Sequence, residues 1–131
     1  RLNPRDRAMA LLRAFRYNGR PYDYNFDFQS DDALVCSELI FKAYEPANGF
    51  QGLALPIKTV AGRFMVAPND IARSFAEARE LGKAQFEFVF FYDGREDKGA
   101  SEESTLEAFL GAWQRPKWHV VKQKWFTEAE E

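Results

Sequence analysis

The sequence of 131 residues contains a single cysteine, Cys36, and a single histidine, His119. One cysteine excludes an intramolecular disulfide and a multi-cysteine metal site, and one histidine excludes most histidine metal sites. The fold must therefore be held by buried apolar surface. Hydrophobic residues make up 46% of the chain and aromatic residues 16%, enough for the core of one ordinary domain. We expect neither a metal nor a cofactor.

The charge balance narrows the classes of partner. Eighteen Lys and Arg side chains stand against twenty Asp and Glu, for a net charge of −2, whereas a general nucleic-acid binder carries a basic excess. We therefore expect no nucleic-acid partner. No apolar run is longer than that of residues 88–92, which is far shorter than the roughly 18 residues that cross a bilayer, so no transmembrane segment is predicted. The chain begins at Arg1 without a signal peptide, which indicates a piece of a longer protein and leaves its compartment open.

Capping residues and apolar spacing predict four helices. The first follows Asn3, a good helix cap, and ends at Asn18-Gly19. Its apolar stripe consists of Ala8, Leu11, Leu12 and Phe15. The other predicted helices are residues 34–44, capped by Ser30, Asp31 or Asp32; residues 68–81; and a helix that starts within residues 101–104 and stops at Pro116.

Strand signals lie mainly in the second half of the chain. Residues 85–92 are the strongest predicted strand, followed by a turn at Asp93-Gly94, and residues 118–126 are a predicted last strand. The aromatic and polar alternation of residues 22–28 predicts a half-buried extended segment. Residues 50–66 are predicted to form loops and one short strand. The pattern indicates an α+β fold with antiparallel strands toward the C-terminus.

Cys36 lies in the first turn of the second predicted helix, where a thiol can become a nucleophile. A cysteine attacks carbonyl groups as the thiolate, and a free thiol has a pKa near ~8.5 that the protein must lower. Unpaired N–H groups and the helix dipole stabilise an anion there, and the same N–H groups can hold a substrate oxyanion. The alternative is a buried cysteine that packs as a small hydrophobic side chain.

The motif around the cysteine is Leu-Val-Cys-Ser-Glu-Leu-Ile, residues 34–40, preceded by aromatic and acidic residues. It resembles the NlpC/P60 cysteine peptidases, and more closely their permuted YiiX/YebB-like branch. There the nucleophile motif reads Cys-Ser-Glu-Leu-Val/Ile and follows a Tyr-Asp-x-x-Phe-Asp stretch. The resemblance covers about residues 5–75, and its further matching segments are residues 19–22, 22–27, 43–44, 62–63 and 67–72.

The resemblance implies a papain-like fold in circularly permuted order, with Cys36 as nucleophile at the N-terminus of a core helix. It also implies that residues 1–131 are one domain, the C-terminal part of a larger one whose His-bearing β-barrel lies upstream of Arg1. That upstream part of the same parent chain is expected to complete the site. The residues around His119 lack the glycine and the strand motif that surround the family's catalytic histidine. We therefore expect His119 to be an ordinary histidine of the last predicted strand rather than the catalytic base.

Four further residues are candidate substrate-binding groups: Tyr22, Tyr24, Glu38 and Arg63. The two tyrosines resemble the family tyrosine near the nucleophile, or they are packed aromatic residues with satisfied hydroxyls. Glu38 should point away from Cys36 on a helix, which favours a structural role over the binding of a cationic group. Arg63 could meet a substrate carboxylate, or it is an ordinary surface arginine.

These observations predict a bacterial cysteine hydrolase of the thiol protease or amidase type. Its substrate would contain an amide or ester bond, and the resemblance implies a cell-wall peptide, an amino-acid amide or a lipid acyl group. Two alternatives stay open. One is a lipid acyltransferase of the related permuted branch, and the other is a non-catalytic binding module that retains the fold.

Overall fold

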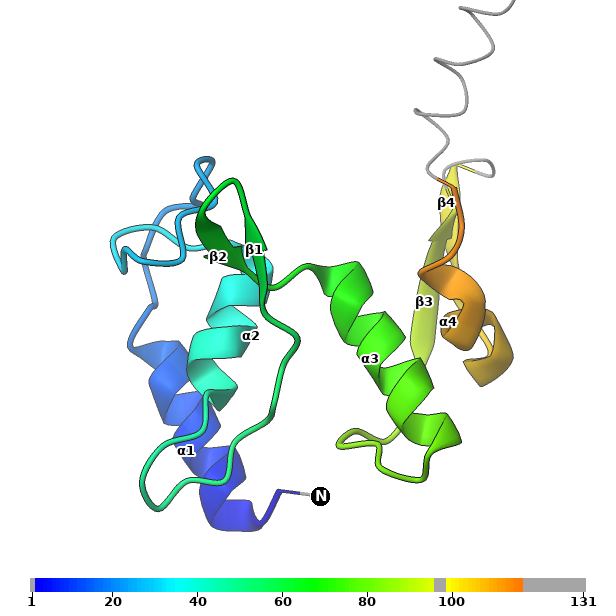
Figure 1. Ribbon diagram of the computed structural model, residues 1–131, viewed down its shortest axis with the longest axis horizontal. Coiled ribbons are helices and arrows are strands. Elements are labelled where there is room, and N and C mark those ends of the chain that lie inside the picture. Colours follow the sequence, from blue (N-terminus) through cyan, green and yellow to red (C-terminus); the bar gives the residue numbers. More distant parts are fainter. Residues whose placement is uncertain (1, 96–98, 117–131) are drawn as a thin grey trace, which may run out of the picture. The chain divides into compact units, whose positions relative to one another are not determined.

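The computed structural model describes residues 2–95 and 99–116 (Figure 1). In these ranges the chain forms four helices and two small antiparallel sheets, so the predicted α+β class is confirmed. The chain divides into two compact units, residues 1–86 and residues 87–131, and each is described by itself. The prediction that residues 1–131 belong to one larger domain stays a prediction.

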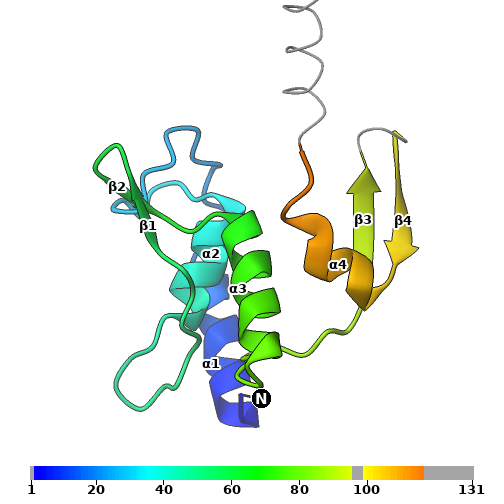
Figure 2. The same ribbon diagram turned by 45° about the vertical axis from the view of Figure 1, so that its right-hand side comes forward.

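The first unit opens with helix α1 (Pro4–Phe15), which begins as predicted. The Asn3 side chain accepts a hydrogen bond from the Asp6 N–H at 2.8 Å, and this satisfies one of the unpaired N–H groups of the first turn. Helix α1 lies side by side with α2 (Cys36–Tyr44) in both views (Figures 1 and 2). Its buried residues are Asp6 and Ala10.

The predicted apolar stripe of α1 does not face the helix that packs against it, α2. Leu11, Leu12 and Phe15 are 59%, 58% and 72% exposed. The helix packs through the opposite side, where Ala10 is small and the Asp6 carboxylate accepts a hydrogen bond from the Gln51 N–H at 3.3 Å. Periodicity identifies an amphipathic helix, but it does not identify which face the neighbouring helix covers.

A small core follows in the loop and hairpin after α2. Strands β1 (Lys58–Val60) and β2 (Arg63–Met65) form an antiparallel hairpin where the sequence predicted loops and one short strand. Leu53, Leu55 and Val66 are buried together. The partly buried residues packed against them are Leu2, Phe28, Phe41, Tyr44, Ile71 and Phe86.

Helix α3 (Pro68–Glu80) matches the predicted third helix, with Pro68 at its first position and Leu81 as its C-terminal cap. Its first turn is tied to the hairpin, because Lys58 Nζ donates a hydrogen bond to Asp70 Oδ1 at 2.7 Å. The helix contributes Ile71 to the surroundings of the core, and Phe75 is buried against Phe86 with ring centroids 6.5 Å apart.

The second unit contains a β-hairpin and a short helix. Strand β3 (Phe91–Arg95) pairs antiparallel with β4 (Ala100–Ser104), and α4 (Leu106–Ala112) follows. Thr105 caps α4, since its hydroxyl accepts the Ala108 N–H at 3.2 Å. Arg115 Nη1 donates to the buried Asp93 carboxylate at 2.8 Å.

Three boundaries predicted for this unit are wrong. The strand predicted for residues 85–92 begins only at Phe91, and the predicted turn at Asp93-Gly94 lies inside β3, opposite Glu102 and Ser101. The predicted helix start at residues 101–104 is strand β4. Pairing between strands overrides local turn and cap signals here, because the ladder satisfies the backbone of polar residues that would otherwise form turns.

The predicted strand at residues 118–126, including His119, lies outside the described residues. None of the helices that the structure describes is both long and apolar enough to cross a membrane.

Candidate functional site

Cys36 is the first residue of α2, and its side chain is exposed. Val35 precedes it with extended backbone, and the first helical hydrogen bond of this end runs from the Leu39 N–H to the Val35 carbonyl at 3.0 Å. The N–H groups of the turn between these residues have no carbonyl acceptor within the helix. The thiol therefore lies at the positive end of the helix, as the sequence predicted, and it is not packed into the core.

A hollow of about 270 Å³ opens beside the thiol. Its walls are formed by Tyr17, Arg20, Pro21, Tyr22, Leu34, Val35, Cys36 and Leu39. This volume lies just below the range of ~300–1,000 Å³ that is typical of small-molecule sites. The hollow can hold the reacting end of a substrate together with a short apolar group, rather than a large ligand as a whole.

The wall that carries Tyr22 is fixed to the chain immediately before Cys36. The Leu34 N–H donates to the Pro21 carbonyl at 3.0 Å, and the Asp23 N–H donates to the Leu34 carbonyl at 3.2 Å. Tyr22 and Leu34 thus form a parallel bridge. Because Leu34 is two residues before Cys36, the tyrosine backbone and the nucleophile candidate are held in one rigid arrangement.

The segment between Tyr22 and Leu34 is a closed loop. The extended structure predicted for residues 22–28 is therefore wrong. The buried Asp23 carboxylate accepts hydrogen bonds from the N–H groups of Asn25, at 2.7 Å, and Asp27. An aspartate that accepts the backbone N–H groups two and four residues further along folds the chain into a turn. The aromatic residues Tyr22, Tyr24 and Phe26 are exposed by 49%, 83% and 45%, so their alternation with polar residues does not mark a buried face.

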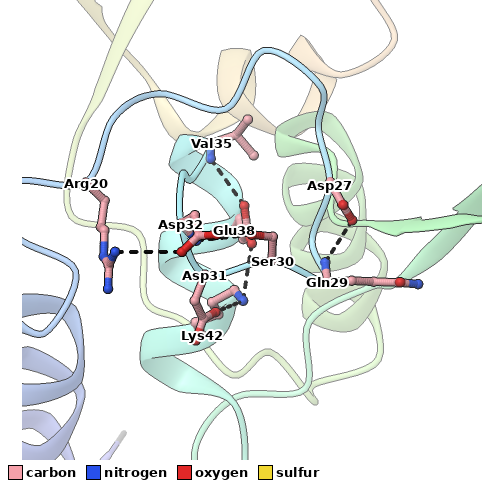
Figure 3. Close-up of polar contacts among 9 residues, drawn as sticks. All are labelled: Arg20, Asp27, Gln29, Ser30, Asp31, Asp32, Val35, Glu38 and Lys42. Atoms are coloured by element: carbon pink, nitrogen blue, oxygen red, sulfur yellow. Dashed lines mark hydrogen bonds and ion pairs between the residues drawn. The ribbon is translucent and has the colours of Figure 1, made fainter.

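Glu38 caps α2 from inside the helix (Figure 3). The fully buried Glu38 side chain accepts a hydrogen bond from the Val35 N–H through Oε2 at 3.3 Å, and its Oε1 lies 3.3 Å from Lys42 Nζ. Lys42 also donates to Asp31. The predicted caps Ser30, Asp31 and Asp32 are therefore wrong. A glutamate three residues after the cap position and four before a lysine was the signal available in the sequence.

Burial governs the ionisation of this pair. It raises the pKa of Glu38 above its usual value, although the Val35 N–H and Lys42 oppose the rise. Burial lowers the pKa of Lys42, but hydrogen bonds to Asp31 and Glu38 outweigh it and leave that pKa raised. The ammonium group of Lys42 is thus stabilised between the carboxylates of Asp31 and Glu38.

Arg63 holds the closed loop that Asp23 folds, through a hydrogen bond to Asn25. Its Nη1 donates to the Asn25 carbonyl at 2.7 Å, which ties β2 to residues 23–34. Of the four candidate substrate-binding residues, Tyr22 lines the hollow beside Cys36, whereas Tyr24, Glu38 and Arg63 do not. A substrate-binding role for all four residues, Tyr22 included, stays a prediction.

Sequence reasoning missed Tyr17 and Arg20, which follow α1 and reach the hollow only because the chain folds back before Pro21. The Arg20 side chain is 47% exposed and its Nη1 lies 3.9 Å from Asp32 Oδ1, a loose ion pair in which the guanidinium can still meet an anionic ligand. In the described ranges, no group of His, Cys, Asp and Glu residues is arranged to hold a metal ion.

Comparison with known proteins gives a local similarity. A stretch of 38 residues, 29% of this chain, is 47% identical to the uncharacterized protein YiiX of Escherichia coli (strain K12). The match covers 18% of YiiX. No family model matches the chain, and no solved structure matches it. The chain is therefore YiiX-like over part of its length.

Proposed function

We propose that this chain carries the nucleophile of a cysteine hydrolase with a papain-like fold, of the permuted NlpC/P60 type found in the YiiX/YebB-like branch. The observation that carries the proposal is the exposed Cys36 thiol at the start of α2, beside a hollow large enough for an acyl group. The partial identity to YiiX is consistent with this assignment.

The chemistry follows from the position of the thiol. The Cys36 thiolate attacks the carbonyl carbon of an amide or ester, and the N–H groups of the first turn of α2 stabilise the oxyanion. The C–N or C–O bond then breaks, the leaving amine or alcohol takes the proton that the base accepted from the Cys36 thiol, and a thioester forms on Cys36. Water, deprotonated by the same base, attacks the thioester, which releases the acid and the thiol.

The base in this proposal is a histidine that comes from the part of the parent chain upstream of Arg1. No histidine lies within the described ranges. The arrangement of Tyr22 and Arg20 on the walls of the hollow suits an acyl substrate that has an apolar or aromatic part and a nearby carboxylate.

The test is hydrolysis by the parent protein that includes the upstream segment. Fluorogenic esters and amides are assayed with the wild type and with Cys36→Ala. We expect turnover with the wild type and at least a ~10³-fold loss in the variant, because the nucleophile has no substitute. Transfer of the acyl group to an added alcohol or amine instead of water would favour the acyltransferase alternative. Equal rates for both proteins would exclude Cys36 chemistry.

A further inference from the structure

The outward face of α1 is apolar and uncovered. Leu11, Leu12 and Phe15 are more than half exposed, and the helical repeat of 100° per residue places all three on one arc, opposite the buried Asp6 and Ala10. Large exposed apolar patches of this kind mark interaction surfaces. A partner is therefore expected on this face.

Basic side chains border the apolar face on both edges. The helical repeat places Arg7 beside Leu11 on one edge and Arg5 and Arg16 beside Leu12 on the other. None of the three arginines forms an ion pair with another residue in the described part of the chain. Residues 1–20 contain six Arg and one Asp, a charge of +5, although the whole chain carries −2.

Arg13 differs from these three. Its Nη1 donates to the Glu45 carbonyl at 2.6 Å, and its guanidinium lies 4.3 Å from the centre of the Phe50 ring. Arg13 thus belongs to the inward side of α1 and stabilises the contact with the chain after α2. The charge that remains available to a partner is the charge that borders Leu11, Leu12 and Phe15.

We propose that α1 docks this face on an anionic lipid surface. An apolar strip between two cationic edges matches the acyl-chain and phosphate levels of a bilayer interface, and guanidinium groups bind phosphate oxygens through paired N–H donors. A second copy of the same face would bring like charges together, so the charge pattern argues against self-association. The proposal is independent of the chemistry at Cys36.

The test is sedimentation, with vesicles, of the parent protein that includes the segment upstream of Arg1. We expect binding to phosphatidylcholine vesicles that contain about 30% phosphatidylglycerol, little binding to phosphatidylcholine alone, and a loss of binding at about 1 M salt. Arg5→Gln with Arg16→Gln should lower partitioning roughly 30-fold, since each arginine near the surface contributes about a fivefold factor. Leu12→Gln with Phe15→Gln should lower it at least ~10-fold.

Matched controls carry the same changes elsewhere on the first unit. Arg79→Gln with Lys83→Gln removes two exposed charges, and Val60→Gln with Leu81→Gln removes two exposed apolar side chains. Both controls should change partitioning less than about twofold. Circular dichroism checks that every variant is folded.

Three results would overturn the proposal. They are the absence of binding to anionic vesicles, equal effects of the α1 variants and their controls, and a concentration-dependent dimer in analytical ultracentrifugation that the Leu12 and Phe15 changes dissociate. The last result would assign the face to a second copy of the chain. A failure of ester or amide hydrolysis would leave vesicle binding unaffected, so the two proposals fail separately.

Discussion

The Glu38 carboxylate accepts a hydrogen bond from the Val35 N–H at 3.3 Å and so caps α2, the helix that begins with Cys36. The same carboxylate lies 3.3 Å from Lys42 Nζ. One buried side chain therefore orients the start of α2 and anchors the lysine that binds Asp31 in the preceding loop. The pair of Glu38 and Lys42 therefore holds the start of the helix on which the Cys36 thiol lies.

Replacing Glu38 by Ala should lower the free energy of unfolding by about 3 kcal/mol, because it leaves a buried N–H unpaired and removes a partner of Lys42. Urea denaturation followed by circular dichroism measures the change. Glu77→Ala is the matched control, since Glu77 forms an i,i+4 pair with Arg73 at 3.5 Å on the surface. That variant should lose less than about 0.5 kcal/mol. Equal losses would show that burial of the Glu38 pair contributes nothing.

The raised pKa of Glu38 predicts the sign of a pH dependence. A carboxyl whose pKa is raised on folding stabilises the protein below its unfolded value of 4.5, and this contribution disappears as the pH rises through the folded value. The difference in unfolding free energy, wild type minus Glu38→Gln, should therefore be larger at pH 4.5 than at pH 7. Denaturation curves at both pH values measure it. A difference that grows with pH would contradict the raised pKa.

Gly52 occupies a place where no side chain fits. A Cβ atom there would lie 2.3 Å from the Tyr44 carbonyl oxygen, and the residue has a φ of +60°. Gly52→Ala should cost at least ~3 kcal/mol, because the backbone at the end of α2 must move. Gly19→Ala separates the two causes, since Gly19 also has a positive φ, +82°, but nothing lies within 4 Å of its Cβ position. It should cost only about 1 kcal/mol, and thermal melts compare the two.

Asp23 should be required for the closed loop beside the hollow. Asp23→Asn leaves one acceptor oxygen for two backbone N–H groups, and we expect a loss of about 1.5 kcal/mol. Hydrogen exchange should accelerate at the amides of Asn25 and Asp27, which donate to this carboxylate. Asp27→Asn, which removes only a carboxylate that accepts an exposed bond from the Gln29 N–H, should leave the exchange of the Asn25 amide unchanged. Unchanged exchange in both variants would contradict the role of Asp23.

The sequence predicted the elements whose signals are local. Asn3 caps α1 and Pro68 opens α3 as expected, because a cap depends only on residues within one turn. The position of Cys36 at a helix start was predicted for the same reason. Its surroundings were not, since Tyr17 and Arg20 reach the hollow where the Leu34 N–H donates to the Pro21 carbonyl, a contact that no local pattern encodes.

The predictions that were wrong also failed because contacts between distant segments, which no local pattern encodes, determine the structure there. Asp93 and Gly94 form a turn signal when considered alone, but they lie in β3 because β4 pairs with them. The stripe of Leu11, Leu12 and Phe15 was identified correctly as apolar, yet the neighbouring helix packs on the other side of α1. The spacing of apolar residues shows that a helix face is apolar, whereas tertiary contacts determine whether a neighbouring element covers that face.

The measurement that tests the central claim most directly is the alkylation rate of Cys36 by iodoacetamide, followed by intact mass. The chain offers one thiol, and Cys36→Ser provides the blank. We expect the folded protein to react at pH 7 about 10-fold faster than the same chain in denaturant, because the exposed thiol is the first residue of α2 and lies at the positive end of the helix. A folded protein that reacts more slowly than the unfolded chain would contradict Cys36 as a nucleophile.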